Sequence, residues 1–345
     1  MGHKDITPAP GGAAMSEQTV TSDQANAESA LPQQKADSNT AKQVIADICL
    51  GDCLDVLQAV PDGKFDLIVT SPPYADRRAK TYGGIPPDKY VQWFLPRSEQ
   101  FRRVLKPTGT FILNIKEKAE NGERHTYVIE LILALRKQGW LWTEEFIWHK
   151  KNCYPGKWPN RFRDAWERCL QFNRSRDFKM FQDAVRVPMG DWADRRLKDL
   201  GKNDVIRFNS QVGSGFGKNI ANWIDRKWAY PNNVLHLATE CGNKNHSATF
   251  PRALPQWFIK LFTEESDWVL DPFLGSGTTS EVAQKMGRNS LGIEIKEEFC
   301  QVARQSVIPN EMLLLESTAS YGKDHKGRDH QVHRRRNTVI PPEAP

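Results

Sequence analysis

The sequence predicts an α/β fold built on a mostly parallel sheet. Short runs rich in Val, Ile and Leu alternate with segments of helical periodicity, which is the pattern of parallel strands joined by covering helices. A chain of 345 residues can also bury such a core without a metal or a disulfide framework. The six cysteines are scattered along the chain, which favours reduced structural thiols over a zinc site.

The expected elements follow one another in order along the chain. Strands are expected at residues 44–50, 65–70, 110–115, 143–148, 268–271 and 290–294. Helices are expected at residues 88–105, 126–138, 251–262, 278–286 and 296–306. Lys106-Pro107-Thr108-Gly109 is the expected stop signal of the first helix.

Three segments depart from this pattern. Residues 1–43 lack large apolar side chains and residues 317–345 form a basic tail, so both are expected to be disordered. Residues 150–230 combine glycine turns with dense charge, which predicts an irregular insertion rather than further sheet.

Basic and aromatic residues gather in the middle of the chain. Residues 148–245 hold 19 Lys and Arg against 10 Asp and Glu, together with six of the eleven tryptophans. Cations mixed with aromatic rings suit a surface that binds phosphates and stacks on bases. An ordinary basic face with core tryptophans is the alternative. No apolar run approaches the roughly 20 residues that span a bilayer, and no signal peptide is apparent, so we expect a cytoplasmic protein without a membrane partner.

A buried strand is expected to end at Thr70-Ser71-Pro72-Pro73-Tyr74. The two prolines fix the backbone and remove two N–H donors, so the segment offers a rigid set of hydrogen-bond acceptors. An exocyclic amino group is a poor nucleophile, because its lone pair is delocalised into the ring. Acceptors such as the Ser71 side chain and the Pro72 carbonyl would favour a localised lone pair, and an extruded base could stack on Tyr74. A simple Pro-Pro turn is the alternative.

The second motif, at residues 269–279, reads Val-Leu-Asp-Pro-Phe-Leu-Gly-Ser-Gly-Thr-Thr. It predicts a strand followed by a glycine turn that opens a helix, where a ligand can approach the backbone. About 20 residues later, Glu294 supplies a carboxylate expected to bind ribose hydroxyls. Ser280 stands where the dinucleotide fingerprint has glycine, and no phosphate loop is present. The motif therefore favours an adenosine-containing ligand without a pyrophosphate.

Together and in this order, the two motifs resemble those of the β class of amino-group DNA methyltransferases from restriction-modification systems. The resemblance covers residues 44–307 and implies a Rossmann-like methyltransferase fold with circularly permuted motif order. It implies a catalytic half at residues 44–149, a target-recognition region at 150–230 and a cofactor-binding half at 231–316. It also implies methyl transfer from S-adenosylmethionine to duplex DNA by base flipping and direct displacement, without a metal. Such systems imply a cognate restriction endonuclease as a partner. They also imply that the protein is located in the prokaryotic cytoplasm, associated with the nucleoid.

The resemblance assigns roles to further residues. The catalytic residues are expected to be Ser71, Pro72, Pro73 and Tyr74. Those expected to bind the cofactor are Asp52, Thr70, His246, Phe250, Asp271, Phe273, Gly275, Ser276, Gly277, Thr278, Thr279 and Glu294. Those expected to bind DNA are Arg77, Arg78, Lys80, Lys150, Lys151, Arg161, Arg163, Arg168, Arg174 and Arg176. Asp52 would serve equally well as a turn residue after a strand.

The target base follows from two features. Methylation at cytosine C5 needs a cysteine nucleophile, usually in a Pro-Cys dipeptide, and the sequence has no Pro-Cys. In the family that the motifs resemble, Ser at the position of Ser71 is associated with N4-cytosine enzymes and Asp or Asn with adenine enzymes. We therefore expect N4-cytosine methylation, with N6-adenine methylation as the alternative. Methylation of RNA or of a glutamine side chain and an inactive DNA-binding module are rivals that the basic region and the intact motifs disfavour.

Overall fold

The computed structural model describes residues 44–76, 82–153, 156–157, 159–190, 226–239 and 250–307, and the backbone alone at 206–207 and 218–219. The two tails expected at residues 1–43 and 317–345 lie outside this part. The described residues all belong to one structural unit, Ala41–Pro345. Within them, no helix is long and apolar enough to cross a membrane.

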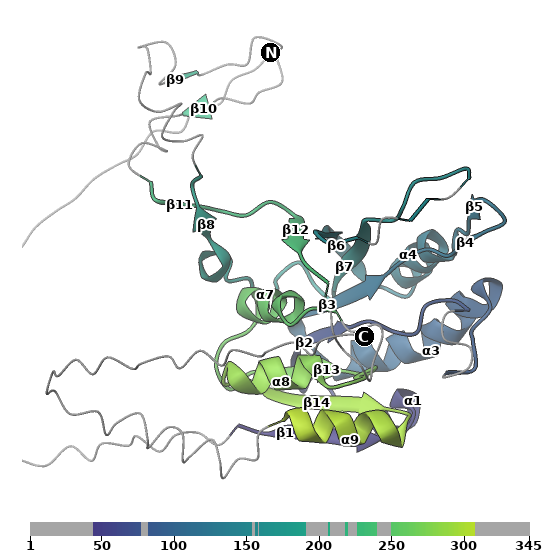
Figure 1. The fold of residues 1–345 in the computed structure, drawn as a ribbon. Helices are drawn as coiled ribbons and strands as arrows, with labels where there is room; N and C mark the ends of the chain where they lie inside the picture. Colours follow the sequence, from purple (N-terminus) through teal and green to yellow (C-terminus); the bar gives the residue numbers. More distant parts are fainter. Residues whose placement is uncertain are drawn as a thin grey trace, which may run out of the picture. The chain divides into compact units, whose positions relative to one another are not determined.

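An eight-stranded sheet lies at the centre of the described structure (Figure 1). In chain order its strands are β1 (Ala46–Leu50), β2 (Phe65–Thr70), β3 (Leu105–Ile115), β6 (Leu141–Lys150), β7 (Trp166–Asn173), β12 (Val234–Leu237), β13 (Trp268–Asp271) and β14 (Asn289–Glu294). In space their order is β1, β14, β13, β2, β3, β7, β6, β12. All of them run in one direction except β7, which is antiparallel to both of its neighbours. The predicted mostly parallel sheet is confirmed.

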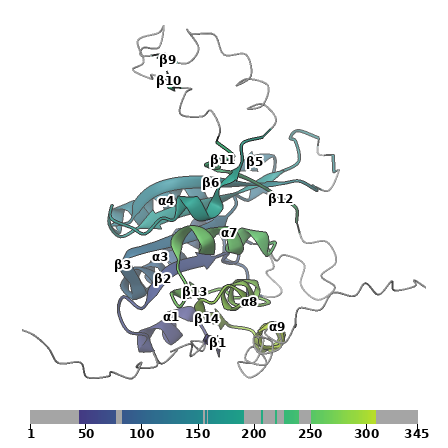
Figure 2. The ribbon, with the colours of Figure 1, turned by 90° about the vertical axis from the view of Figure 1, so that its left-hand side faces the viewer.

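Helices cover both faces of this sheet. One face carries α1 (Cys53–Val56), η1 (Leu57–Ala59), α3 (Pro87–Val104) and α4 (Tyr127–Lys137). The other carries α7 (Ala253–Phe262), α8 (Thr278–Lys285) and the short η2 (Gln182–Val185), and Figure 2 shows α7 and α8 on the face toward the viewer. The last helix, α9 (Glu297–Ser306), packs against α8 and β1. Each face thus has its own apolar core.

The remaining elements are two-residue strands outside the main sheet. They form three antiparallel pairs, which are β4 (Ala119–Glu120) with β5 (Glu123–Arg124), β8 (Val187–Pro188) with β11 (Trp228–Ala229), and β9 (Ile206–Arg207) with β10 (Lys218–Asn219). Every strand and helix expected from the sequence is present in the structure, with ends that differ by a few residues.

The predicted stop of the first helix before residues 106–109 is confirmed, but the strand that follows begins earlier than expected. The helix α3 does end at Val104, but β3 begins at the next residue instead of after Gly109. The pairing of β2 with β3 shifts register at this point, so the segment forms a bulge inside the strand. The Lys106 ammonium group lies 2.8 Å from both carboxylate oxygens of Asp66 and holds the bulge in place.

The expectation that residues 150–230 lie outside the sheet is wrong for β7. This strand lies between β3 and β6, although three of its residues, Glu167, Gln171 and Asn173, are polar and buried. Gln171 Nε2 donates to Asn173 Oδ1 at 2.8 Å, and Asn173 Nδ2 donates to Thr110 Oγ1 at 2.9 Å. Asn173 and Thr110 meet only once β7 is paired with β3, so the same residues look like a polar loop in the sequence.

Candidate active site

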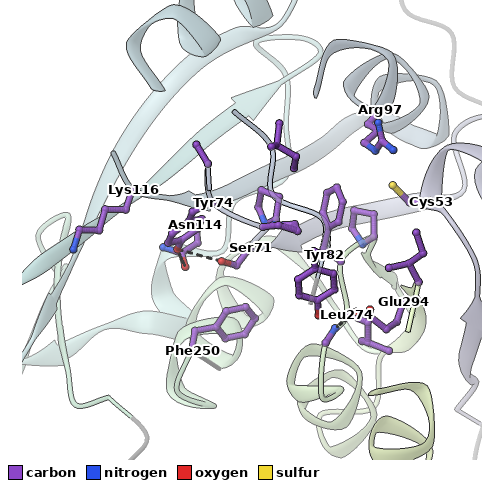
Figure 3. A pocket seen from close by; sticks show the side chains of 18 of the residues that line it. Cys53, Ser71, Tyr74, Tyr82, Arg97, Asn114, Lys116, Phe250, Leu274 and Glu294 are labelled. Carbon is purple, nitrogen blue, oxygen red and sulfur yellow. Dashed lines mark hydrogen bonds between the residues drawn. The ribbon is translucent and has the colours of Figure 1, made fainter. Parts of the chain in front are cut away.

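A cavity of about 850 Å³ opens where β2, β3, β13 and β14 end. The carboxyl ends of parallel strands meet at one edge of a sheet, so segments far apart in the sequence converge there. Because β7 is antiparallel, it brings its first residues to the same edge. The cavity is lined at one end by Ser71, Pro72, Pro73 and Tyr74, and at the other by the glycine turn and Glu294 (Figure 3).

A hydrogen-bonded network surrounds the predicted catalytic residues. Ser71 Oγ lies 3.2 Å from the Tyr74 hydroxyl, which lies 2.7 Å from Glu167 Oε2 and 3.2 Å from Asn114 Oδ1. Lys150 Nζ lies 2.5 Å from the other oxygen of Glu167. Figure 3 shows Ser71, Tyr74 and Asn114 side by side, with the Phe250 ring close to them. This end of the cavity is a polar cluster closed by an aromatic side chain.

The position of Tyr74 is set by its surroundings. The Tyr90 hydroxyl donates to the Pro73 carbonyl at 2.9 Å and fixes the loop on which Tyr74 lies. Burial raises the pKa of Tyr74 well above its usual value, and the charge of the Glu167 carboxylate adds to this shift. The Tyr74 hydroxyl therefore stays protonated at neutral pH and acts as a neutral hydrogen-bond donor.

The glycine turn and Glu294 form the other end of the cavity. Glu294 Oε2 accepts from the Gly275 amide at 2.9 Å, and Oε1 accepts from the Lys296 amide at 3.0 Å. Gly275 adopts a φ of 56°, in the left-handed region that glycine tolerates. Burial raises the pKa of Glu294, although the two amide hydrogen bonds oppose the shift. The carboxylate is thus fixed beside the turn, where it faces the cavity.

Aromatic and charged side chains from α3 complete this end. The rings of Trp93 and Phe273 lie 5.7 Å apart, and the Arg97 guanidinium lies 4.4 Å from the Trp93 ring. Arg97 also forms an ion pair with Asp52 at 2.6 Å, and Asp52 caps α1 through the Leu54 amide. Aromatic walls with fixed carboxylates fit the adenosine and the sulfonium of S-adenosylmethionine, since carboxylates bind hydroxyls and rings attract a cation.

Four of the predicted cofactor residues support the cavity instead of lining it. The Asp271 carboxylate is buried and accepts from the hydroxyls of Thr70 and Thr279, both at 2.6 Å, and from the Phe273 amide at 3.1 Å. Asp271 thereby joins β2, which carries the catalytic loop, to the helix that follows the glycine turn. Gly277, at the start of that helix, packs against Ala303 of α9. The prediction of direct cofactor contact is corrected for these residues, namely Thr70, Asp271, Gly277 and Thr279.

Asp271 should also make the stability of the protein depend on pH. Burial raises the pKa of Asp271 to about 6 in the folded protein, against 3.8 in an unfolded chain. The folded protein therefore binds this proton more tightly, so the stabilisation is complete below pH 3.8 and is lost as the pH rises through about 6. Compared with Asp271→Asn, the wild type should gain up to about 3 kcal/mol of unfolding free energy between pH 8 and pH 4. Urea unfolding of both proteins at several pH values measures this gain. A difference in unfolding free energy between the two proteins that does not change with pH would contradict the prediction.

The predicted DNA-binding residues lie in different places. Lys150 lines the cavity and pairs with Glu167, while Lys151 and Arg163 are exposed nearby on the loop that joins β6 to β7. Arg161 pairs with Asp164 at 3.1 Å. Arg168 lies between the carboxylates of Glu117 and Glu145, so its charge is neutralised inside the protein.

Arg174 and Arg176 need a correction. They follow the end of β7 opposite to Glu167, and about 24 Å separates Arg174 from Glu167 at the usual rise of about 3.4 Å per residue. The Arg174 guanidinium donates to the Leu105 carbonyl at 2.5 Å, near the amino end of β3. Neither arginine belongs to the edge of the sheet on which the cavity opens. Four other predicted residues, Arg77, Arg78, Lys80 and His246, lie outside the described part of the chain.

Several residues of the site were not predicted. Asn114 is the last residue but one of a strand that was expected from the sequence, so a polar residue near the carboxyl end of a buried strand was the available signal. Trp93 and Arg97 lie one turn apart on an expected helix, but nothing in the sequence marks that face. Glu167 carried no usable signal, because its strand was not expected. Lys116 and Lys118 also line the cavity, where Lys116 pairs with Asp164 at 3.0 Å and Lys118 with Asp76 at 2.8 Å.

Comparisons with known proteins agree with this geometry. Residues 65–305 match N6_N4_Mtase, a DNA methylase family. The chain is 29% identical over 271 residues to the type II methyltransferase M.PvuII of Proteus hauseri, covering 72% of this chain and 80% of that protein. It is 30% identical over 269 residues to M.BglII of Bacillus subtilis, covering 78% of this chain and 70% of that protein.

Solved structures show the same fold. The PvuII DNA methyltransferase, described as cytosine-N4-specific, superposes with a TM-score of 0.58 at 24% identity, over 81% of this chain and 92% of that one. A putative DNA modification methylase of Thermus thermophilus, complexed with S-adenosyl-L-methionine, superposes with a TM-score of 0.51 at 21% identity, over 76% of this chain and 92% of that one.

Proposed function

We propose, from the premise that this chain belongs to the N6_N4_Mtase family of DNA methylases, that it methylates the N4 amino group of cytosine in duplex DNA. The chain is a DNA methyltransferase that uses S-adenosylmethionine. The observation that carries the finer proposal is Ser71, a small neutral acceptor at the end of β2. The PvuII enzyme, with which this chain shares its fold, is itself described as cytosine-N4-specific.

The residues of the cavity suit a flipped base. Ser71 Oγ and the Pro72 carbonyl would accept the two hydrogens of the amino group, and this would direct its lone pair away from the loop. The rings of Tyr74 and Phe250 would hold the base by stacking. S-adenosylmethionine supplies an electrophilic methyl group when it is bound. The protein contributes by positioning, which converts an encounter of two substrates into a reaction between aligned groups.

The cysteines support a direct displacement without a covalent intermediate. Cys53 lines the cavity, and burial raises the pKa of its thiol to about 12. Burial also raises the pKa of the Cys169 thiol, which lies behind Asn114. Neither thiol is ionised at neutral pH, so neither is a nucleophile of the kind that C5 methylation requires. These two thiols therefore do not compete with the amino nitrogen as the attacking atom.

The DNA is proposed to lie against the edge of the sheet on which the cavity opens. Lys151 and Arg163 are exposed on the loop that joins β6 to β7, where they would contact phosphates. Target recognition is proposed for the part of residues 150–230 that remains once β7 is assigned to the sheet. A cognate restriction endonuclease is the proposed partner, since the matched relatives are type II methyltransferases of bacteria. The bacterial cytoplasm is the proposed location.

Analysis of methylated nucleosides tests the proposed base. Plasmid DNA is incubated with the protein and methyl-labelled S-adenosylmethionine, digested to nucleosides and separated. We expect the label in N4-methylcytosine, and duplex DNA should be a better substrate than RNA of the same sequence. Label in N6-methyladenine alone would replace the cytosine assignment by the adenine one, and label only in RNA or protein would refute duplex DNA as the substrate. Sequencing of the methylated plasmid would then give the recognition site.

A further inference from the structure

Glu167 is a buried carboxylate in direct contact with the catalytic loop. It lies at the start of β7, its residue is only 7% exposed, and it lines the cavity. Its Oε2 atom lies 2.7 Å from the Tyr74 hydroxyl and 3.3 Å from Asn114 Nδ2, and its Oε1 atom lies 2.5 Å from Lys150 Nζ. All three neighbours are hydrogen-bond donors, so both oxygens of this carboxylate are held in place.

The distances fix the direction of the hydrogen bonds around Tyr74. A tyrosine hydroxyl has one hydrogen to donate, and the charged oxygen of Glu167 at 2.7 Å is a better acceptor than the neutral oxygen of Asn114 at 3.2 Å. The Tyr74 oxygen can then accept from Ser71, whose hydroxyl lies 3.2 Å away. Because Ser71 donates its own hydrogen to Tyr74, its lone pairs are left to face the amino group of the base.

We propose that Ser71, Tyr74 and Glu167 form a proton relay that ends on Glu167, an inference that rests on the amino-group methylation proposed above. The amino nitrogen forms a bond to the methyl carbon as the bond from that carbon to sulfur breaks. As positive charge develops on the nitrogen in this transition state, the nitrogen gives one proton to Ser71 Oγ. Ser71 passes its hydroxyl proton to the Tyr74 oxygen, and Tyr74 passes its own to Glu167 Oε2. The carboxylate becomes a neutral carboxylic acid.

This relay keeps the charge of the cavity constant. The positive charge of the sulfonium disappears as the negative charge of Glu167 is neutralised, and Lys150 keeps its charge throughout. Since the pKa of Tyr74 is raised, a tyrosinate is not formed, and the two transfers at Tyr74 occur together. Asn114 has no titratable group and takes no proton from the relay. It holds the network in place by donating to Glu167 and to the Arg168 carbonyl. Glu167 acts through Tyr74 and is therefore a positioning residue and the final proton acceptor.

A double-mutant cycle tests the relay. The rate of methyl transfer is measured in a single turnover, with the protein in excess over a duplex that contains the recognition site. We expect Glu167→Gln and Tyr74→Phe each to lower this rate by roughly 10–100-fold, near the lower end of general acid–base effects. The double variant should be no slower than Tyr74→Phe, because both changes break one chain. Affinities for S-adenosylmethionine and DNA should stay within about twofold.

Two features keep this test decisive. Glu167→Gln leaves Lys150 without its ion-pair partner and could fold poorly, whereas Tyr74→Phe removes only a hydroxyl and leaves that pair intact. Glu145→Gln is the matched control. Glu145 lies on the neighbouring strand β6, its carboxylate pairs with Arg168, and it is not among the residues that line the cavity. Its transfer rate should equal that of the wild type.

A second measurement needs neither cofactor nor DNA. With tyrosine labelled by carbon-13 at Cζ, the Tyr74 signal among the seven tyrosines is assigned by its loss in Tyr74→Phe. It should shift in Glu167→Gln and stay in place in Glu145→Gln. A wild-type rate in Glu167→Gln, multiplied losses in the double variant, or an unmoved Cζ signal would each refute the relay. The proposed function would survive these outcomes, since it fails only if the wild type does not methylate DNA.

Discussion

Replacing Ser71 by alanine should lower the single-turnover rate of methyl transfer by roughly 10²–10³-fold, the usual effect of removing one fixed hydrogen-bonding group from a reacting centre. In the proposed function the hydroxyl accepts a hydrogen of the amino group and so localises its lone pair, and it is the first member of the proposed relay. Alanine cannot accept a hydrogen bond at this position. S-adenosylmethionine should still bind with an affinity within about twofold of the wild type, because its proposed contacts lie at the other end of the cavity.

A matched control separates this effect from the loss of any buried hydroxyl. Ser290 lies in β14 of the same sheet, and within the described structure its buried hydroxyl has no hydrogen-bond partner. Ser290→Ala should therefore leave the transfer rate unchanged. Equal rates for Ser71→Ala and the wild type would contradict the role of Ser71. Rapid-quench assays with labelled S-adenosylmethionine, together with calorimetric binding, provide both numbers.

Replacing Gly277 by alanine should destabilise the protein and weaken the binding of S-adenosylmethionine. Gly277 has a φ of 91°, in the left-handed region, and an added Cβ would lie 2.8 Å from both Cα and Cβ of Ala303. The backbone strain and the overlap with α9 should together cost roughly 2–5 kcal/mol of unfolding free energy. Relief of the overlap would move the start of α8, and with it the turn that carries Gly275 and Ser276.

Gly63 provides the control for the strain alone. It also has a positive φ, 62°, but an added Cβ would meet nothing within 4 Å. Gly63→Ala should therefore cost only about 1 kcal/mol and should not affect S-adenosylmethionine binding. Chemical denaturation and calorimetric titration of both variants measure the difference. If the two variants lose the same stability and the same affinity, then the contact between α8 and α9 does not position the turn.

Much of the fold could be predicted because its central parallel strands are buried and mostly apolar. Phe65–Thr70 and Trp268–Asp271 are examples, and each has the bounds expected from the sequence. The two motifs were found for the same reason, since each directly follows such a strand. Residues that contact their neighbours within a few positions, such as Asp52 as the cap of α1, also act as their local sequence suggests.

β7 shows where prediction from the sequence ends. Its residues Glu167, Gln171 and Asn173 resemble those of an exposed loop, but all three are buried. Glu167 pairs with Lys150 of β6 and Asn173 donates to the Gly109 carbonyl of β3, while Gln171 donates to Asn173. The same strand carries Glu167 into the catalytic network and takes Arg174 away from it. No local pattern contains this information, because the partners lie tens of residues away in the chain.

By itself, the sequence determined the fold class, the Pro-Pro loop at Ser71 and the glycine turn before α8, because each depends on residues that are close together in the chain. Only the tertiary structure decided which side chains share the cavity and which support it from behind. Asp271 connects two motifs about 200 residues apart through its bond to Thr70, and Glu167 reaches Tyr74 across the sheet. Buried polar groups of this kind are satisfied by distant partners, so their roles appear only when the sheet is assembled.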